Sequence, residues 1–261
     1  MYTLYVIPTH PGRSAMLMLE YKQVRYRRVE LVTLLHPLSV RLRGFDAGGE
    51  TRTAGGRRTL GIRLGDLLGT VPALAADGRR ISTNRQIARF LEDRHPEPAL
   101  FPADPDRRRA VEEAERWGND TFQMAARRVL TAAAARDPAA FSHIAADGRI
   151  GYLLSRNELL RRLAIPPIAS AFAVNKGSDR KLLAELPPML DRIDVWIGDG
   201  VLGQQQPNVA DFMIAPSLAL ILYRPDVAPM FEGRPSLALV DRLLPEPGSA
   251  TVKPQPVAHT S

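Results

Sequence analysis

Apolar and polar positions near the start of the chain follow two different periods. Aromatic and β-branched residues dominate residues 2–7 and predict a strand, which a loop at residues 8–12 ends. Residues 15–19 supply the apolar face of a helix, and the alternation over residues 24–35 predicts a second strand. The chain is therefore expected to open with a β–α–β unit.

A hairpin and a further helix are expected after this unit. Two short β-type runs within residues 70–82 are separated by Asp77-Gly78, a strong turn signal, and residues 84–93 have helical spacing. The intervening residues 44–69 are rich in Gly, Arg and Thr. They predict a long surface excursion that ends in a short helix near residues 62–68.

The second half of the chain has a helical pattern throughout. Asp104 or Asp106 can cap a long helix. Further helices are expected at residues 155–163, 168–175, 179–197, 208–223 and 236–244. Asn208 and Asp211 form a capping-box pair at the start of one of them.

These elements predict two domains with a tail. Residues 1–95 form an α/β domain that contains the excursion, and residues 96–103 form a proline-rich linker. Residues 104–244 form an all-helical domain. The Pro-, Ser- and Thr-rich residues 245–261 are expected to be disordered.

Composition excludes several classes of chemistry. The chain has 261 residues, 45% of them apolar and 24% charged, which is ordinary for a globular protein. The absence of cysteine excludes disulfides, thiolate metal sites and a cysteine nucleophile. No metal site is expected either, because the histidines share no ligand spacing; they stand at positions 10, 36, 95, 143 and 259.

Charge and apolar content narrow the expected partners and location. The longest apolar stretch, residues 212–223, is interrupted and too short for the ~30 Å core of a membrane, and the amino terminus lacks a leader pattern. We therefore expect a cytoplasmic protein with no membrane partner. The net charge of +7 favours anionic partners, but the arginine-rich excursion lacks the interleaved aromatic residues that stack on bases. Nucleic acid is not an expected partner.

Several segments together resemble the glutathione transferase superfamily. They are YTLYVIPTHPGRSAMLMLEYKQVRYRRVEL, TVPAL, DGRRISTNRQIARFLE, PALFP and NVADFMIAPSL. The resemblance covers residues 2–101 well and 104–244 loosely. It implies a thioredoxin-like α/β domain followed by an all-α domain, with glutathione as co-substrate and a homodimeric assembly.

The resemblance also implies where a thiol would be activated. The family places a hydroxyl or thiol donor just before its first helix, and Thr9 stands at this position with His10 beside it. A donated hydrogen bond stabilises a thiolate and lowers the pKa of the thiol, and a histidine can assist near neutral pH. Arg13 is a candidate contact for a ligand carboxylate. The alternative is an ordinary loop with an exposed arginine.

Two further segments correspond to the family's glutathione-binding site. A cis bond at Val71–Pro72 would turn the backbone N–H and C=O of Val71 toward the loop after the first strand, where they can pair with a peptide ligand. Thr83 and Asn84 replace the usual acid or glutamine followed by serine at a helix start. Backbone N–H groups there suit the γ-glutamyl carboxylate. A trans proline and a plain helix cap are the alternatives.

Two aromatic residues are candidates for the pocket that would hold the electrophilic substrate. Trp117 and Phe122 can line an apolar substrate pocket between the domains, although aromatic residues at helical spacing also suit a core. The expected activity is addition of the glutathione thiolate to a small electrophile. The alternatives are a non-catalytic scaffold that binds hydrophobic ligands or partner proteins, and a glutathione-dependent isomerase.

Overall fold

The computed structural model describes residues 1–7, 10–32, 35–47, 53–137, 157–175 and 177–244. Its first part contains a four-stranded sheet in the order β2-β1-β3-β4. The strands are β1 (Tyr2–Val6), β2 (Tyr26–Glu30), β3 (Ala73–Ala76) and β4 (Arg79–Ser82). Strand β1 is parallel to β2 and antiparallel to β3. This mixed sheet is the predicted thioredoxin-like arrangement.

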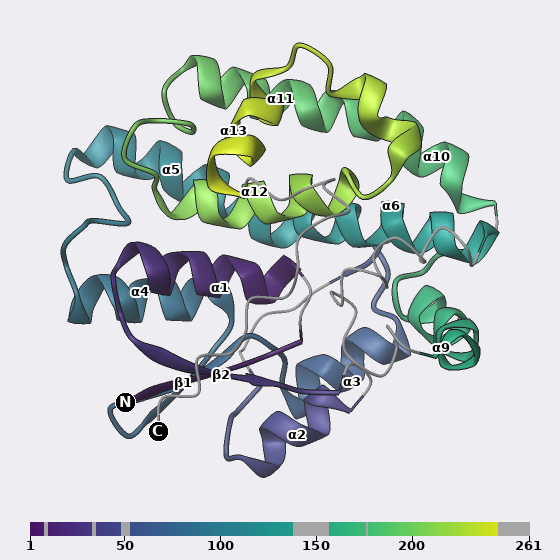
Figure 1. Ribbon diagram of the computed structural model, residues 1–261, viewed down its shortest axis with the longest axis horizontal. Helices are drawn as coiled ribbons and strands as arrows, with labels where there is room; N and C mark the ends of the chain where they lie inside the picture. Colours follow the sequence, from purple (N-terminus) through teal and green to yellow (C-terminus); the bar gives the residue numbers. More distant parts are fainter. Residues whose placement is uncertain (8–9, 33–34, 48–52, 138–156, 176, 245–261) are drawn as a thin grey trace.

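Helices cover both faces of the sheet (Figure 1). One face carries α1 (His10–Tyr21) and α4 (Asn84–Arg94), which bury Leu4 and Leu74. The other face carries α2 (His36–Leu42) and α3 (Leu60–Leu68), and Val40 of α2 packs there with Ala73. Successive side chains along each central strand therefore point to opposite faces of the sheet, and helices bury them on both.

The rest of the described chain is helical, as predicted. Its helices are α5 (Pro105–Trp117), the π-helix η1 (Gly118–Phe122), α6 (Gln123–Arg136), α9 (Glu158–Ala171), α10 (Ser178–Ala184), α11 (Leu186–Gly198), α12 (Val209–Ile221), the 3₁₀ helix η3 (Pro225–Met230) and α13 (Pro235–Leu243). Asp104 caps α5 by accepting a hydrogen bond from the Arg107 N–H at 2.9 Å. Within the described ranges, none of the helices has the length and apolar character needed to cross a membrane.

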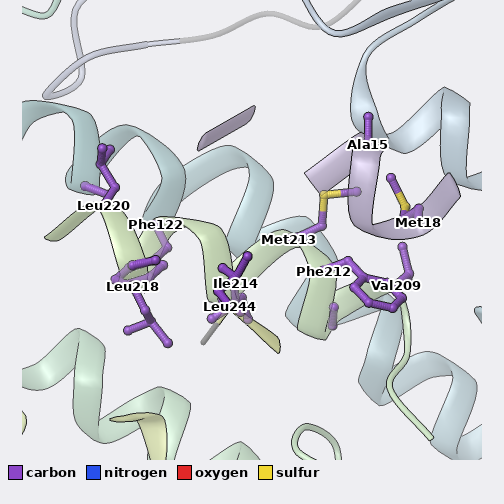
Figure 2. Close-up of a cluster of buried hydrophobic side chains, with 14 of the residues drawn as sticks. Ala15, Met18, Phe122, Val209, Phe212, Met213, Ile214, Leu218, Leu220 and Leu244 are labelled. Carbon is purple, nitrogen blue, oxygen red and sulfur yellow. The ribbon is translucent and has the colours of Figure 1, made fainter. Parts of the chain in front are cut away.

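Helix α12 is the centre of the molecule. All of its residues are buried, and it packs against α1, α5, α6 and α13. Figure 2 shows Val209, Phe212 and Met213 beside Ala15 and Met18 of α1. One continuous hydrophobic core therefore joins the sheet-containing half to the helical half.

The predicted capping box at the start of α12 is confirmed. The Asn208 side chain accepts a hydrogen bond from the Ala210 N–H at 2.9 Å, and Asp211 accepts from the Asn208 N–H at 2.9 Å. Asp211 also accepts from the Gly203 N–H at 2.8 Å. The box thus fixes both the helix start and the loop that leads into it.

A buried lysine holds the segment that connects the two halves. The Lys22 ammonium donates to Glu92 at 2.7 Å and to the His95 carbonyl at 2.6 Å. The same Glu92 carboxylate accepts from the backbone N–H groups of Leu100 and Phe101. The proline-rich segment is therefore tied to α1 and α4 by charge-assisted hydrogen bonds.

Two element predictions for the first half are wrong in part. The strand expected at residues 24–35 ends at Glu30, and α2 begins at His36, where no helix was predicted. This helix is short, carries a proline in its first turn and buries only Val40, so its periodic signal is weak. The surface excursion at 44–69 does end in a helix, α3, but the expectation of exposure is wrong for Phe45, Ala54 and Ile62, which are buried.

In the second half one predicted pair of helices is a single helix. Residues 158–171 form α9, which continues through Pro166 and Pro167, although these prolines predicted a break. The reverse occurs at 179–197, where Glu185 separates α10 from α11. The predictions for residues 138–156 and for the tail 245–261 lie outside the described residues.

Candidate functional site

Three chain segments meet at one edge of the sheet. Tyr5 of β1 pairs with Ala73 of β3, and Ala73 pairs with Ser82 of β4. The residues that follow β1, precede β3 and follow β4 are therefore neighbours. A hydrogen bond from the Thr83 N–H to the Pro72 carbonyl, at 3.2 Å, links two of them directly.

The Val71–Pro72 peptide bond is cis. Val71 itself is 95% buried, and its carbonyl accepts a long hydrogen bond of 3.4 Å from the Thr70 hydroxyl. Among the described residues, none accepts a hydrogen bond from the Val71 backbone N–H. This segment therefore carries a backbone donor that a bound ligand can use.

Thr83 has an unusual backbone conformation at the start of α4. Its φ is 65° and its ψ 150°, a region that glycine occupies almost exclusively, so a β-branched residue there is strained. Its hydroxyl caps α4 by accepting from the Gln86 N–H at 3.3 Å. The cap is therefore Thr83 and not Asn84, and the Thr83 side chain is used within the protein.

Asn84 is the first residue of α4 and is 97% buried. Among the residues that the structure describes, its Oδ1 atom has no hydrogen-bond partner, and the Nε of the next residue, Arg85, has none either. Buried polar atoms of this kind are rare in folded proteins, and a bound water, ion or ligand is a common partner for them. At the start of α4 they accompany the positive end of the helix dipole.

A buried carboxylate, that of Glu115 in α5, is paired with partly exposed arginines of α4. Both terminal nitrogens of Arg89 in α4 donate hydrogen bonds to the carboxylate of Glu115 in α5, Nη2 at 2.6 Å. Burial raises the pKa of Glu115, while Arg89 opposes that shift. Arg85 lies 3.9 Å from the same carboxylate. One carboxylate faces two guanidinium groups, so the start of α4 keeps an excess of positive charge.

The comparison with solved structures decides the fold. A glutathione S-transferase of Rhodospirillum rubrum F11 is 22% identical, with a TM-score of 0.54 and coverage of 99% of this chain and 97% of its own. The chain has the glutathione S-transferase fold. A glutathione S-transferase of Ceriporiopsis subvermispora in complex with glutathione is 17% identical, with a TM-score of 0.58 over 97% of this chain and 99% of its own.

A third structure with this transferase fold belongs to an enzyme with another name. The β-etherase LigF of Sphingobium sp. strain SYK-6 is 17% identical, with a TM-score of 0.59 and coverage of 93% of this chain and 94% of its own. A scan against protein-family models finds no match to the chain, and neither does a search of the curated proteins. The predicted fold class is thus confirmed by similarity of structure, although sequence identity to these proteins is low.

The candidate thiol-activating residues Thr9 and His10 come shortly after β1 in the sequence. Thr9 lies outside the described residues, and for His10 only the backbone is described, as the first residue of α1. Arg13 follows in the next turn and is half-buried. Their roles remain predictions.

The two aromatic candidates for a substrate pocket lie in the helical half. Phe122 is fully buried in the main core, and Trp117 stacks on it with ring centroids 5.2 Å apart. Trp196 packs edge-on against Trp117, and Arg192 lies over both indole rings. These contacts are typical of a packed core.

The ion pairing of Glu115 with Arg85 and Arg89 was not predicted from the sequence. Arg85 and Arg89 are four residues apart on α4, and Glu115 falls on the apolar stripe of α5 that also holds Val111. A carboxylate on an apolar stripe is the signal that predicts a buried ion pair. The partner could not be read from the sequence because it lies in the other half of the chain.

Proposed function

We propose that this protein binds glutathione and transfers its thiolate to a small electrophile. The peptide would lie along the Val71–Pro72 segment and point its γ-glutamyl carboxylate at the start of α4. The observation that carries the proposal is a pair of groups at this edge that have no partner among the described residues, the Val71 N–H and the Asn84 Oδ1 atom. A peptide ligand supplies an acceptor for the first and an ammonium or amide donor for the second.

Charge at the start of α4 supports a ligand with a carboxylate. Arg85 keeps a half-exposed guanidinium beside Asn84, because Glu115 is already held by two hydrogen bonds from Arg89. The α4 dipole adds to this positive field. Two of the structures that share the fold were solved with glutathione or glutathione sulfonate bound, which agrees with the proposal.

The reaction needs a thiolate and a place for its proton. The Thr9 hydroxyl would donate a hydrogen bond to the sulfur, which lowers the pKa of the thiol, and the proton passes to solvent or to His10. The sulfur lone pair then forms a C–S bond to the electrophilic carbon. The displaced electron pair leaves with a leaving group or is protonated in an addition.

Substitution at the loop tests the roles of Thr9 and His10. Thr9→Ala should lower kcat about tenfold near pH 6.5, because loss of the donor raises the pKa of the bound thiol by about one unit. Thr9→Ser keeps the hydroxyl and should retain most of the activity. The ultraviolet absorbance of bound thiolate against pH measures the shift. Full activity in both Thr9→Ala and His10→Ala, in a panel of electrophiles, would show that neither residue is the donor.

One observation favours the second candidate, a transferase-like scaffold without catalysis that binds hydrophobic ligands or partner proteins. Thr83 stands where the family usually has an acid or glutamine, so this position offers a ligand no carboxylate or amide. Its hydroxyl is used to cap α4. If glutathione binds but no electrophile in the panel is consumed, the scaffold is the better account.

The proposed assembly follows from the resemblance. We propose a homodimer that acts in the cytoplasm. Sedimentation equilibrium of the full chain should give twice the mass of 28.8 kDa. A monomer across the micromolar range would contradict the dimer.

A further inference from the structure

A separate cavity of about 210 Å³ lies between the first half of the chain and the helical half. Gly55 and Gly56 form one wall, and the facing walls come from the segment η1–α6 and from the α10–α11 junction. In Figure 1, α6 and α10 lie side by side next to α9. None of the residues assigned above to glutathione lines this cavity in the described part of the chain, so it is distinct from that site.

The glycine wall is a tight turn whose backbone conformation favours glycine. Ala54 and Arg57 exchange two backbone hydrogen bonds of 2.9 and 3.1 Å around Gly55 and Gly56. Both glycines have positive φ, 56° and 74°, as a two-residue hairpin turn requires. Fully buried Ala54 packs against Met124 of α6, which fixes the turn on the helical half.

Arg128 of α6 is held in place through its Nε atom. Its Nε–H donates to the Phe172 carbonyl at 3.2 Å, and its guanidinium lies against Gly55, where a Cβ atom would come within 2.7 Å of Nη2. Within the described ranges, no residue accepts a hydrogen bond from Nη1 or Nη2 of Arg128. A guanidinium fixed at Nε presents its other donors as a ready fork for a carboxylate.

The other residues that line the cavity indicate the polarity and charge of the rest of the ligand. Met124, Leu182 and Leu186 are buried and give the cavity an apolar surface. Asp120 and Glu185 also line it, so a second negative charge on a ligand would be repelled. A cavity of about 150 Å³ holds benzene, so this one has room for one ring or a chain of about six carbons.

We propose that this cavity binds a small monocarboxylate with an apolar body. The carboxylate accepts hydrogen bonds from Nη1 and Nη2 of Arg128, and the apolar part packs against Met124, Leu182 and Leu186. This inference goes beyond the proposed transferase function and does not depend on it.

Three compounds of equal length test the site in the wild-type protein. Hexanoate should bind saturably in a calorimetric or ligand-observed NMR titration. Hexanamide lacks the charge and adipate adds a second one, so both should bind at least tenfold more weakly. Equal affinity for hexanoate and hexanamide, or no saturable binding of hexanoate, would overturn the proposal.

Three variants locate the binding. Arg128→Gln should weaken hexanoate at least tenfold and leave hexanamide unchanged, whereas Ala125→Leu, which fills the cavity, should weaken both. Arg107→Gln, at an exposed arginine of α5, is the matched control and should change neither. Hexanoate affinity that survives in both folded cavity variants would contradict the site. Glutathione titrations of the same proteins should be unaffected, which separates this result from the transferase proposal.

Discussion

Thr83 and Asn84 carry two features that cost stability. Thr83 has a positive φ in a region that suits only glycine, and Asn84 buries an oxygen that has no partner in the described part of the chain. Each feature costs about 1–3 kcal/mol in typical proteins. Their adjacency at the start of α4 is the arrangement expected where binding, and not folding, selects the residues.

A substitution at Asn84 should therefore separate stability from binding. Asn84→Leu keeps the branched shape of the side chain and removes the acceptor, so it should raise Tm by about 2 to 4 °C while weakening glutathione binding at least tenfold. Differential scanning calorimetry and titration of the same samples measure both effects. Asn119→Ala, away from the edge, is the control for binding. A lower Tm with unchanged affinity would show that Asn84 is a structural residue.

At the scale of elements, the start of α12 couples the fold to pH. Burial raises the pKa of Asp211 from 3.8 to about 6, while the hydrogen bonds from Asn208 and Gly203 oppose the shift. Because the native state holds this proton more tightly than the unfolded chain, the stability that Asp211 contributes is largest at low pH. It is lost as pH rises through the window from about 4 to 6.

The Asp211→Asn variant tests this sign. Between pH 5 and pH 7 the wild type should lose on the order of 1 kcal/mol of unfolding free energy through Asp211, and the variant should not. Urea unfolding of both proteins at the two pH values gives the difference. If the gap between wild type and variant widens toward pH 7 instead, Asp211 is held ionised and burial does not dominate its pKa.

Elements with local signals could be predicted, and those decided by distant contacts could not. Asn208 and Asp211 are three residues apart and mark the start of α12 by themselves. In contrast, α9 continues through Pro166 and Pro167 and packs against α3 and α6, and Ile62 is buried against Met124 of the helical half. Tertiary packing overrides propensity at these positions, and one sequence does not show which segments will meet.

In the candidate site, too, features with a local signal were predicted and those that depend on distant contacts were not. The cis bond at Val71–Pro72 and the helix start after Ser82 were predicted because the resemblance includes both segments. The Thr83 cap and the pairing of Arg89 with Glu115 were not, because they depend on backbone geometry and on a contact between the two halves.

At the scale of the whole molecule, a single core joins the two halves. The main cluster of buried residues includes Leu4 of β1, Ile87 of α4 and Phe212 of α12. The Lys22–Glu92 pair adds a polar connection through the linking segment. Neither half can therefore lose its packing without exposing the apolar surface of the other.

Unfolding should accordingly be a single transition. Trp117 and Trp196 both lie in the helical half, so their fluorescence reports that half, whereas far-ultraviolet circular dichroism reports all elements. The two signals should give coincident urea curves. Two separated midpoints would show that the halves unfold independently.

Since one fold hosts many activities, glutathione binding by this chain must be measured directly. Calorimetric titration of the purified full chain with glutathione at low salt tests it most directly. The account predicts saturable binding between micromolar and low millimolar, about −8 to −4 kcal/mol, and a Tm that rises with glutathione concentration. No detectable heat, together with an unchanged Tm, would contradict it.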